Sequence, residues 1–520
     1  MIGVGDGDPV ELVGRWGAVI MIGAGLLYVL VLLIASRRAP RIERPRRGGS
    51  SRAKDILVVI LMPCLNEAGV IGASVGRLLD IPDDKLRILV IDDGSDDGTA
   101  DVVRAIPDPR VSVMRRVPPR ARLGKGEALN DALRRVRDQW GGDPRTDVVV
   151  GVVDADGRLE SQAIDEARRA FGNRRIGAVQ FGVRINNRFS SLLARMQDME
   201  FVIFTEVFQR GRRHLHSVGM GGNAQFARLD ALTALGERPW TKSLTEDFDL
   251  GVRLNGTRWV NDFRPTAAVH QQGVTSLRRL LRQRTRWFQG NIQSLNLLGR
   301  AAREQRGLAR ADSTWQILTP YVLLAASLLM ASFGITVLVV VCKAVLGHSQ
   351  TWWWLLGAYL LAFGPGLVFG VLYWRIERSE GLGPLKALAY AHLFVLYGLL
   401  PALFGWRALL REIAGRTGWA KTAREAEEPE DPAESADSAE PAEPMKSTEP
   451  MGPIASLEKT AVVAEAARVR EAAAVPQGFR IPPPLVRVGS PSPSAPLSVP
   501  PESRRSPRPP ARREHHEVAA

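Results

Sequence analysis

The sequence predicts an α/β domain with a mostly parallel sheet and flanking helices, together with transmembrane α-helices and a disordered C-terminal tail. Short runs of Val, Ile and Leu alternate with helical segments between residues 54 and 300, a pattern typical of strands covered by helices on both faces. Uncharged apolar stretches of about 20 residues, the length that crosses a bilayer as a helix, lie on both sides of that region. After residue 424 the chain is dominated by Glu, Asp, Ala and Pro, a composition that buries too little apolar surface to fold.

The first apolar stretch, residues 17–35, is predicted to be a signal-anchor helix. Residues 1–16 are acidic, whereas four arginines closely follow the stretch: Arg37, Arg38, Arg41 and Arg44. A cleaved signal peptide would carry its basic residues first. Because segments rich in Arg stay in the cytosol, we expect residues 1–16 outside the cytosol and the following domain inside it.

Residues 54–300 carry the predicted strands and helices of the soluble domain. Buried strands are expected at 56–62, 86–91 and 148–153, with helices at 70–79 and 126–140. Ligands bind at the carboxyl ends of strands in open α/β sheets. Polar residues that directly follow these strands are therefore the first candidates for a functional site.

Three further apolar segments follow, at 317–341, 353–373 and 385–404. The last contains Lys386, His392 and Pro401, so we expect it to cross the membrane only in part. A full crossing would also place the basic residues that follow it outside the cell, against the positive-inside rule. The tail, residues 425–520, is acidic at first and then rich in Pro, Ser and Arg, and is expected to be disordered.

The net charge of +14 and the two cysteines narrow the class of protein. The arginines cluster beside the apolar segments and in the tail, with no recognisable nucleic-acid module, so no nucleic-acid partner is expected. Two cysteines without a Cys-x-x-Cys motif favour neither a disulfide framework nor a zinc site. A bound metal ion would have to be held by carboxylates.

Two pairs of aspartates follow predicted strands. Asp92 and Asp93 can accept the imide N–H of a uracil ring, although Asp-Gly-Ser is also ordinary turn chemistry. Asp154 and Asp156 can share Mg²⁺ or Mn²⁺ bridging a diphosphate, although a polar loop has the same composition. The repeated arrangement of a strand followed by paired aspartates favours function.

Three other motifs carry candidate residues. The carboxylates of Glu246 and Asp247 suit proton abstraction from a hydroxyl, or alternatively the capping of a helix. The amphipathic segment 276–298 is expected to lie at the membrane interface. Trp287 in this segment can also stack on a sugar, and the arginines of the segment can bind a diphosphate. Lys125, flanked by glycines, can meet a phosphate.

In their order along the chain, these motifs resemble glycosyltransferase family 2, specifically its membrane-bound processive branch of cellulose, chitin, hyaluronan and poly-N-acetylglucosamine synthases. The resemblance covers roughly residues 56–287. It rests on Met-Pro-Cys-Leu-Asn-Glu at 62–67, Asp-Asp-Gly-Ser at 92–95, Gly-Lys-Gly at 124–126, Asp-Ala-Asp at 154–156, Gly-Asn at 222–223, Thr-Glu-Asp at 245–247 and Gln-Arg-Thr-Arg-Trp at 283–287.

The resemblance implies a GT-A-like nucleotide-sugar domain that transfers a sugar with inversion. Asp247 would be the base, supported by Glu246, and Asp154 and Asp156 would hold the Mg²⁺ or Mn²⁺ ion. The residues implied to bind the nucleotide-sugar are Pro63, Asn66, Glu67, Asp92, Asp93, Lys125 and Asp154. Those implied to bind the acceptor and the diphosphate are Gly222, Asn223, Gln283, Arg284, Arg286 and Trp287.

We therefore expect a multi-pass plasma-membrane enzyme that uses a UDP-sugar to extend a polysaccharide from the cytosol. Four candidate spans are few for a polymer channel, so export would call for a membrane partner protein. The first alternative is transfer of single sugars to a lipid acceptor, because ceramide glucosyltransferase-like proteins share the Gln-x-x-Arg-Trp ending. The second is a non-catalytic membrane scaffold, which the presence of every acidic position of the motifs disfavours.

Overall fold

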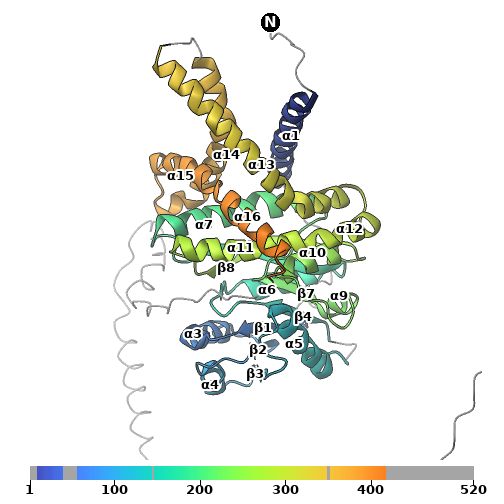
Figure 1. The fold of residues 1–520 in the computed structure, drawn as a ribbon. Helices are drawn as coiled ribbons and strands as arrows, with labels where there is room; N and C mark the ends of the chain where they lie inside the picture. The colour runs from blue at the N-terminus through green and yellow to red at the C-terminus, as the bar shows by residue number, and fades with distance from the viewer. Residues whose placement is uncertain (1–8, 39–54, 143–145, 348–351, 417–520) are drawn as a thin grey trace, which may run out of the picture. The chain divides into compact units, whose positions relative to one another are not determined.

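A computed structural model describes residues 9–38, 55–142, 146–347 and 352–416 (Figure 1). The predicted tail at 425–520 lies outside these residues. The chain begins with a helix that starts before the apolar stretch, and an eight-stranded sheet follows it. The helices up to the end of the α/β domain are α1 (Pro9–Arg37), α3 (Ala68–Leu79), α4 (Thr99–Arg104), α5 (Lys125–Trp140), α6 (Ala163–Phe171), α7 (Leu192–Ile203), the π-helical turn η1 (Phe204–Gln209), α8 (Arg210–Leu215), α9 (Leu229–Thr233), α10 (Glu246–Asn255), α11 (Leu277–Gln293), the 3-10 turn η2 (Ser294–Leu297) and α12 (Leu298–Glu304).

The sheet is mixed, with strand order β3-β2-β1-β4-β7-β6-β8-β5. Its first half is parallel, as predicted, and comprises β1 (Leu57–Cys64), β2 (Leu86–Asp92), β3 (Val111–Arg115) and β4 (Val148–Val152). The second half comprises β5 (Arg158–Leu159), β6 (Ile176–Ile185), β7 (Gln225–Arg228) and β8 (Val260–Gln271). There β7 runs antiparallel to β4 and β6, and β5 runs antiparallel to β8. Both antiparallel strands are very short, so periodicity alone gives little sign of them.

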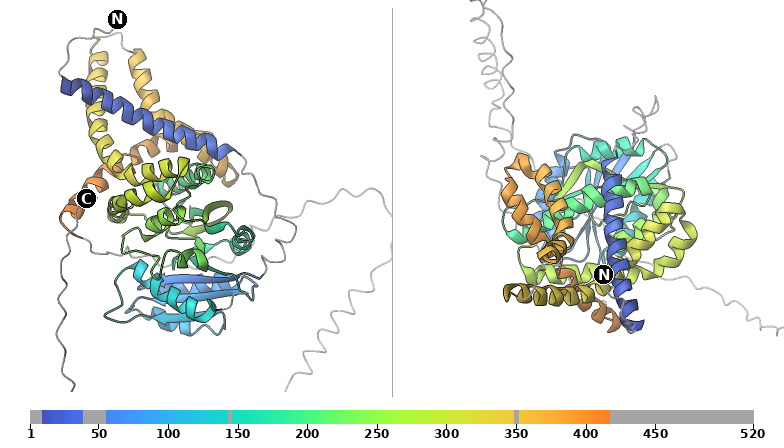
Figure 2. Two further views of the ribbon diagram at one scale, coloured as in Figure 1. Left: turned by 90° about the vertical axis from the view of Figure 1, so that its right-hand side faces the viewer. Right: turned by 90° about the horizontal axis from the view of Figure 1, so that it is seen from above.

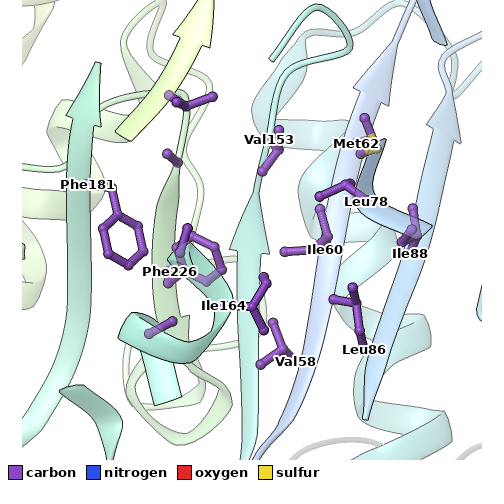
Figure 3. Packing of buried hydrophobic residues seen from close by; sticks show 14 of the residues in the cluster. Val58, Ile60, Met62, Leu78, Leu86, Ile88, Val153, Ile164, Phe181 and Phe226 are labelled. Carbon is purple, nitrogen blue, oxygen red and sulfur yellow. The ribbon is translucent and has the colours of Figure 1, made fainter. Parts of the chain in front are cut away.

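Hydrophobic cores form on both faces of the sheet because successive side chains of a strand point to opposite sides. Along β1, Val58, Ile60 and Met62 join the core under α3 and α6 (Figure 3). The intervening Val59 and Leu61 join the core under α5 and α10. Burial on both faces accounts for the unbroken apolar run that predicted this strand.

The long helices outside the sheet are α1, α13 (Gly307–Val345) and α14 (Trp352–Glu377), and α1 packs against η1, α8 and α13 (Figure 2). Among the described residues, three segments are long and apolar enough to cross a membrane: Ile20–Arg37, Leu355–Glu380 and Pro384–Ile413. The predicted span at 317–341 falls inside α13, where the side chains of residues 330–337 lie outside the described part. Large apolar side chains on α1, such as Leu27 and Ile34, are exposed on the protein surface, as expected of a helix that faces lipid.

Beyond α14, the 3-10 turn η3 (Arg378–Glu380) leads into α15 (Pro384–Tyr397) and α16 (Leu400–Ile413). The predicted single span at 385–404 is therefore two helices of 14 residues each. A helix of that length is roughly 21 Å long, whereas the hydrocarbon core is about 30 Å thick. The break falls just before Pro401, in the first turn of α16, where proline fits best. Neither helix is long enough to cross by itself, whereas the segment Pro384–Ile413 taken as a whole is, so the partial crossing stays a prediction.

Candidate active site

The candidate site lies where three parallel strands end side by side. In the pairing of β1 with β2, Cys64 lies opposite Asp92, and in its pairing with β4, Leu61 lies opposite Val152. The pairing extends past the strand end, because the Asp93 N–H donates to the Cys64 carbonyl at 2.9 Å. The two aspartate pairs that follow separate strands therefore reach the same edge of the sheet.

The loop after β1 is hydrogen-bonded to the loop after β2. Asn66 has a left-handed backbone (φ 55°), and its N–H donates to Ser95 Oγ at 2.9 Å. The Glu67 N–H donates to Thr99 Oγ1 at 3.0 Å, whereas Pro63 lies within β1. Asparagine tolerates a left-handed conformation better than most residues. Asn66 and Glu67 thus hold the shape of this loop, and their contact with a nucleotide stays a prediction.

Asp92 is fully buried at the end of β2. One of its carboxylate oxygens accepts the Ser95 N–H at 2.8 Å, and the other lies 3.5 Å from the Arg115 Nε. The bond to the residue three positions on is turn chemistry. The contacts of Asp92 are therefore those expected of a turn.

Asp93 is held by a buried arginine that sequence reasoning missed. It forms an ion pair with Arg116, which also binds Asp131 at 3.0 Å, and it accepts the Arg122 N–H at 3.0 Å. Burial raises the pKa of Asp93, and the charge of Arg116 and the Arg122 N–H partly oppose the rise. A fixed acceptor at the strand end is what recognition of an imide N–H requires.

Lys125, at the start of α5, joins three parts of the site. Its ammonium donates to Asp154 Oδ1 and to the Gly222 carbonyl, both at 2.6 Å. Burial alone would lower the pKa of Lys125, but the carboxylates of Asp154, Glu246 and Asp247 outweigh it and raise the pKa. Lys125 is therefore a fixed positive charge in the site.

Glu246, which is buried, and Asp247, which is half-buried, form an acidic pair at the start of α10. Burial, followed by the charge of Asp247, raises the pKa of Glu246 to about 7, against the lowering effect of Lys125 and Arg286. Burial likewise raises the pKa of Asp247. Thr245 makes no capping hydrogen bond with its side chain, so capping by that residue does not account for the motif. Two carboxyl groups whose pKa values are raised above their usual range are suited to proton transfer.

Gly222 lies close to both Asp247 and Lys125. A Cβ atom added there would lie 3.2 Å from Asp247 Oδ2 and 3.2 Å from Lys125 Nζ. The next residue, Asn223, accepts the Asp154 N–H at 3.1 Å through its side-chain oxygen. The Gly222-Asn223 turn thus lies against Asp154, Asp247 and Lys125.

Asp154 and Asp156 are the residues of this site suited to a metal ion. Asp156 is buried and accepts the Gln272 N–H at 3.4 Å, whereas the Asp154 side chain is 27% exposed. No cluster of three or more His, Cys, Asp or Glu within the described ranges could hold a metal ion by itself. Mg²⁺ is commonly bound by one or two carboxylates and completed by water and substrate phosphates. Two carboxylates at a strand end fit an ion of that kind.

The four predicted residues of α11 have different surroundings. Gln283 and Arg284 are buried; Arg284 donates to Glu200 at 2.7 Å and its guanidinium lies 4.3 Å from the Trp287 ring centroid. Arg286, in contrast, acts electrostatically on Glu246. The structure therefore brings Arg286 to the acidic pair, whereas Arg284 braces α11 against α7.

Part of the chain also resembles known proteins in sequence. Residues 55–290 match the family described as "Glycosyltransferase like family 2". These residues form a glycosyltransferase family 2 domain. With its mixed sheet and flanking helices, the glycosyltransferase domain has the GT-A-like fold that the resemblance implied.

Relatives of this domain are named for different products. The chain is 31% identical over 287 residues to a β-monoglucosyldiacylglycerol synthase of Synechocystis, matching 54% of this chain and 57% of the relative. It is 25% identical over 241 residues to a poly-β-1,6-N-acetyl-D-glucosamine synthase of Staphylococcus aureus, matching 46% of this chain and 55% of the relative. The chain thus spans little more than half the length of these curated relatives. A solved mannosyltransferase of Pyrobaculum calidifontis in complex with GDP-mannose and Mn²⁺ aligns with a TM-score of 0.47 and 19% identity over 68% of this chain and 96% of its own.

Sequence reasoning also missed a link from the C-terminal helix to the acidic motif. Gln293, on α11 of the glycosyltransferase domain, accepts the Leu244 N–H at 3.3 Å and donates to Glu412 on α16 at 3.0 Å. Gln289, one turn earlier, donates to the same Glu412 carboxylate at 2.9 Å. Two glutamines four residues apart share one helix face, but nothing local indicates a partner more than a hundred residues away. This contact ties the Thr-Glu-Asp loop to a helix outside the domain.

Proposed function

We propose that this protein is a membrane-bound inverting glycosyltransferase that transfers a sugar from a UDP-sugar to a hydroxyl acceptor, with Asp247 as the base. One observation carries the proposal: the adjacent carboxyl groups of Glu246 and Asp247, with both pKa values raised, lie beside the Lys125 ammonium and Gly222. A base with a raised pKa, next to a cation that can meet a diphosphate, is what this reaction needs.

On the donor side, Asp93 accepts the imide N–H of uridine, with Asp92 beside it, and Lys125 neutralises charge on the diphosphate. Asp154 and Asp156 would hold Mg²⁺ or Mn²⁺, which supplies Lewis-acid stabilisation of the leaving phosphate when bound. Lys125 already contacts Asp154 at 2.6 Å, so binding the ion requires this ion pair to rearrange towards the phosphate.

On the acceptor side, Asp247 takes the proton of the attacking hydroxyl. The hydroxyl oxygen forms a bond to the anomeric carbon as the bond from that carbon to the diphosphate oxygen breaks. The bonding pair leaves with UDP, and the single displacement inverts the anomeric carbon. Glu246 and Arg286 set the charge around the base, and Trp287 offers an aromatic face to the acceptor sugar.

For the acceptor, two candidates are supported by different observations. A growing polysaccharide is favoured by the order of motifs and by the poly-N-acetylglucosamine synthase relative. A lipid that receives a single sugar is favoured by the glucosyldiacylglycerol synthase relative and by the small number of candidate spans, three among the described residues, which is few for a polymer channel. Export of a polymer would require a membrane partner protein.

For location, we propose the plasma membrane, with several spans and a cytosolic catalytic domain. The apolar spans support the membrane, and the excess of arginine after α1 supports the orientation. Protease protection in sealed inside-out vesicles tests this: a cytosolic domain is digested without detergent. Protection of the domain until detergent is added would refute the orientation.

The deciding experiment measures UDP release from full-length protein in lipid nanodiscs. A panel of UDP-sugars is supplied with Mg²⁺ or Mn²⁺, and the products are sized by mass spectrometry. A saccharide ladder identifies a polysaccharide synthase, and a lipid carrying one sugar identifies the lipid-acceptor enzyme. Folded protein that releases UDP from no donor, with saccharide and lipid acceptors both present, would refute the proposal and favour a non-catalytic scaffold.

A further inference from the structure

A second polar feature lies away from the candidate active site, where two membrane-associated helices end. A cavity of about 290 Å³ is lined by the last residues of α1, by α7 and η1, and by the end of α14. Its charged and polar lining residues are Ser36, Arg37, Glu206, Arg210 and Arg375. None of them belongs to the glycosyltransferase motifs.

The charge of this lining is positive. Three guanidinium groups remain charged at any physiological pH, against the one carboxylate of Glu206. Glu206 forms an ion pair with Arg210, one helical turn away. Among the described residues, Arg37 and Arg375 have no ion-pair partner and are exposed. Two arginines without an ion-pair partner among the described residues therefore line this cavity.

The rest of the lining is apolar. It consists of Val202, Ile203, Val207, Leu372 and Ile376. One turn before the lining arginines, Ile34 on α1 and Val371 on α14 are 47% and 50% exposed. Residues three or four positions apart lie on one helix face, so each arginine continues an exposed apolar stripe. A ligand that fits this arrangement has an anionic head and apolar chains.

The backbone at the cavity is also unusual. The wall between α7 and α8 is the π-helical turn η1, Phe204–Gln209, which contributes Glu206 and Val207. Single π-turns within α-helices are rare and frequently mark functional sites. The added residue rotates Glu206 and Arg210 relative to the face of α7.

We propose that this cavity binds the phosphate head group of an anionic phospholipid in the leaflet next to the catalytic domain. The cavity is near the lower limit for a ligand pocket, large enough for a phosphate and its glycerol but not for acyl chains. The phosphate accepts hydrogen bonds from Arg37 and Arg375, a pairing that guanidinium geometry favours. The acyl chains lie along the exposed apolar stripes of α1 and α14. The inference rests on the proposed membrane placement of these helices, not on the catalytic proposal.

Native mass spectrometry of full-length protein in a non-ionic detergent, titrated with dioleoylphosphatidylglycerol, tests the site. Each arginine near an anionic lipid head contributes about 1 kcal/mol, which corresponds to roughly fivefold in affinity. We expect Arg375→Gln and Arg37→Gln each to weaken binding of the first lipid by about that factor. Glu206→Gln should strengthen it, because removal of the carboxylate frees Arg210.

Matched controls separate a site from general charge attraction. Arg38→Gln and Arg378→Gln remove one charge each, next to a lining arginine but outside the cavity lining, and should leave binding unchanged. Equal weakening in controls and cavity variants would overturn the proposal, as would equal binding of zwitterionic phosphatidylcholine. Competition by inorganic phosphate at the same concentration as the lipid would instead assign the cavity to a soluble anion. UDP release, measured separately, keeps failure of this site distinct from failure of the catalytic proposal.

Discussion

Replacing Asp247 with asparagine removes the proposed base while keeping the shape of the side chain. Asp247 Oδ1 accepts the Phe248 N–H at 2.8 Å, and the other oxygen faces the space beside Gly222. An asparagine oxygen can keep the first contact, but its amide cannot take up a proton. The local fold should therefore survive, and the proton-transfer step should not.

The size of the effect follows from the role of the group. A positioned general base contributes typically 10²- to 10⁴-fold, about 3 to 5 kcal/mol of the barrier. We expect UDP release by Asp247→Asn to fall by at least about a hundredfold in kcat. UDP affinity should change little, because Asp93, Lys125 and Asp154 make the proposed donor contacts.

The assay compares UDP release in nanodiscs with UDP binding by isothermal titration calorimetry. Glu246→Gln is the neighbouring comparison and should lose less activity, since it supports the base without replacing it. Asp230→Asn, on an exposed position of α9, is the control for removal of a surface charge. Near-normal turnover by Asp247→Asn, or equal loss of turnover and of UDP affinity, would refute the assignment of Asp247 as base.

Three further predictions follow from the same site. First, burial raises the pKa of Glu246 from its ordinary value of 4.5 to about 7. Because the folded state favours the protonated carboxyl group, the thermal unfolding midpoint should fall as pH rises from about 4.5 to 7. The Glu246→Gln variant should show a flatter dependence of the midpoint on pH. A slope unchanged in the variant would contradict the raised pKa. Second, Asp156→Ala should weaken the metal-dependent part of the UDP affinity roughly tenfold or more, in line with losses at metal sites. Calorimetry with and without Mn²⁺ measures this part of the affinity. An unchanged affinity would place the metal ion elsewhere. Third, Gly222→Ala would put a methyl group 3.2 Å from Asp247 and Lys125. A slight misplacement of these groups should lower kcat/KM by about tenfold and leave the thermal unfolding midpoint nearly unchanged. A variant with the kcat/KM of the wild type would show that Gly222 is not part of the site.

Elements whose signal is local could be predicted from the residues alone. The strand β1, the helix α5 and the apolar α1 follow from runs and periods of side chains that need no distant partner. The positions of the aspartate pairs after β2 and β4 follow as well, because carboxylates at the ends of neighbouring parallel strands meet at one edge. Motif order was enough to indicate the family that residues 55–290 match.

Which charges meet, and how deeply they are buried, depends on the packing of segments that are distant in the sequence. Lys125 contacts the carbonyl of Gly222, 97 residues away, and Arg116 pairs with Asp93 in the interior. The pKa of Glu246 rises because the packed chain excludes water around it, an effect that composition and periodicity do not carry. The antiparallel pairing of β7 with β4 and the hydrogen bond that Glu412 accepts from Gln289 on α11 likewise join remote segments. Secondary structure is set largely by neighbours in sequence, whereas the electrostatics of a site is set by neighbours in space.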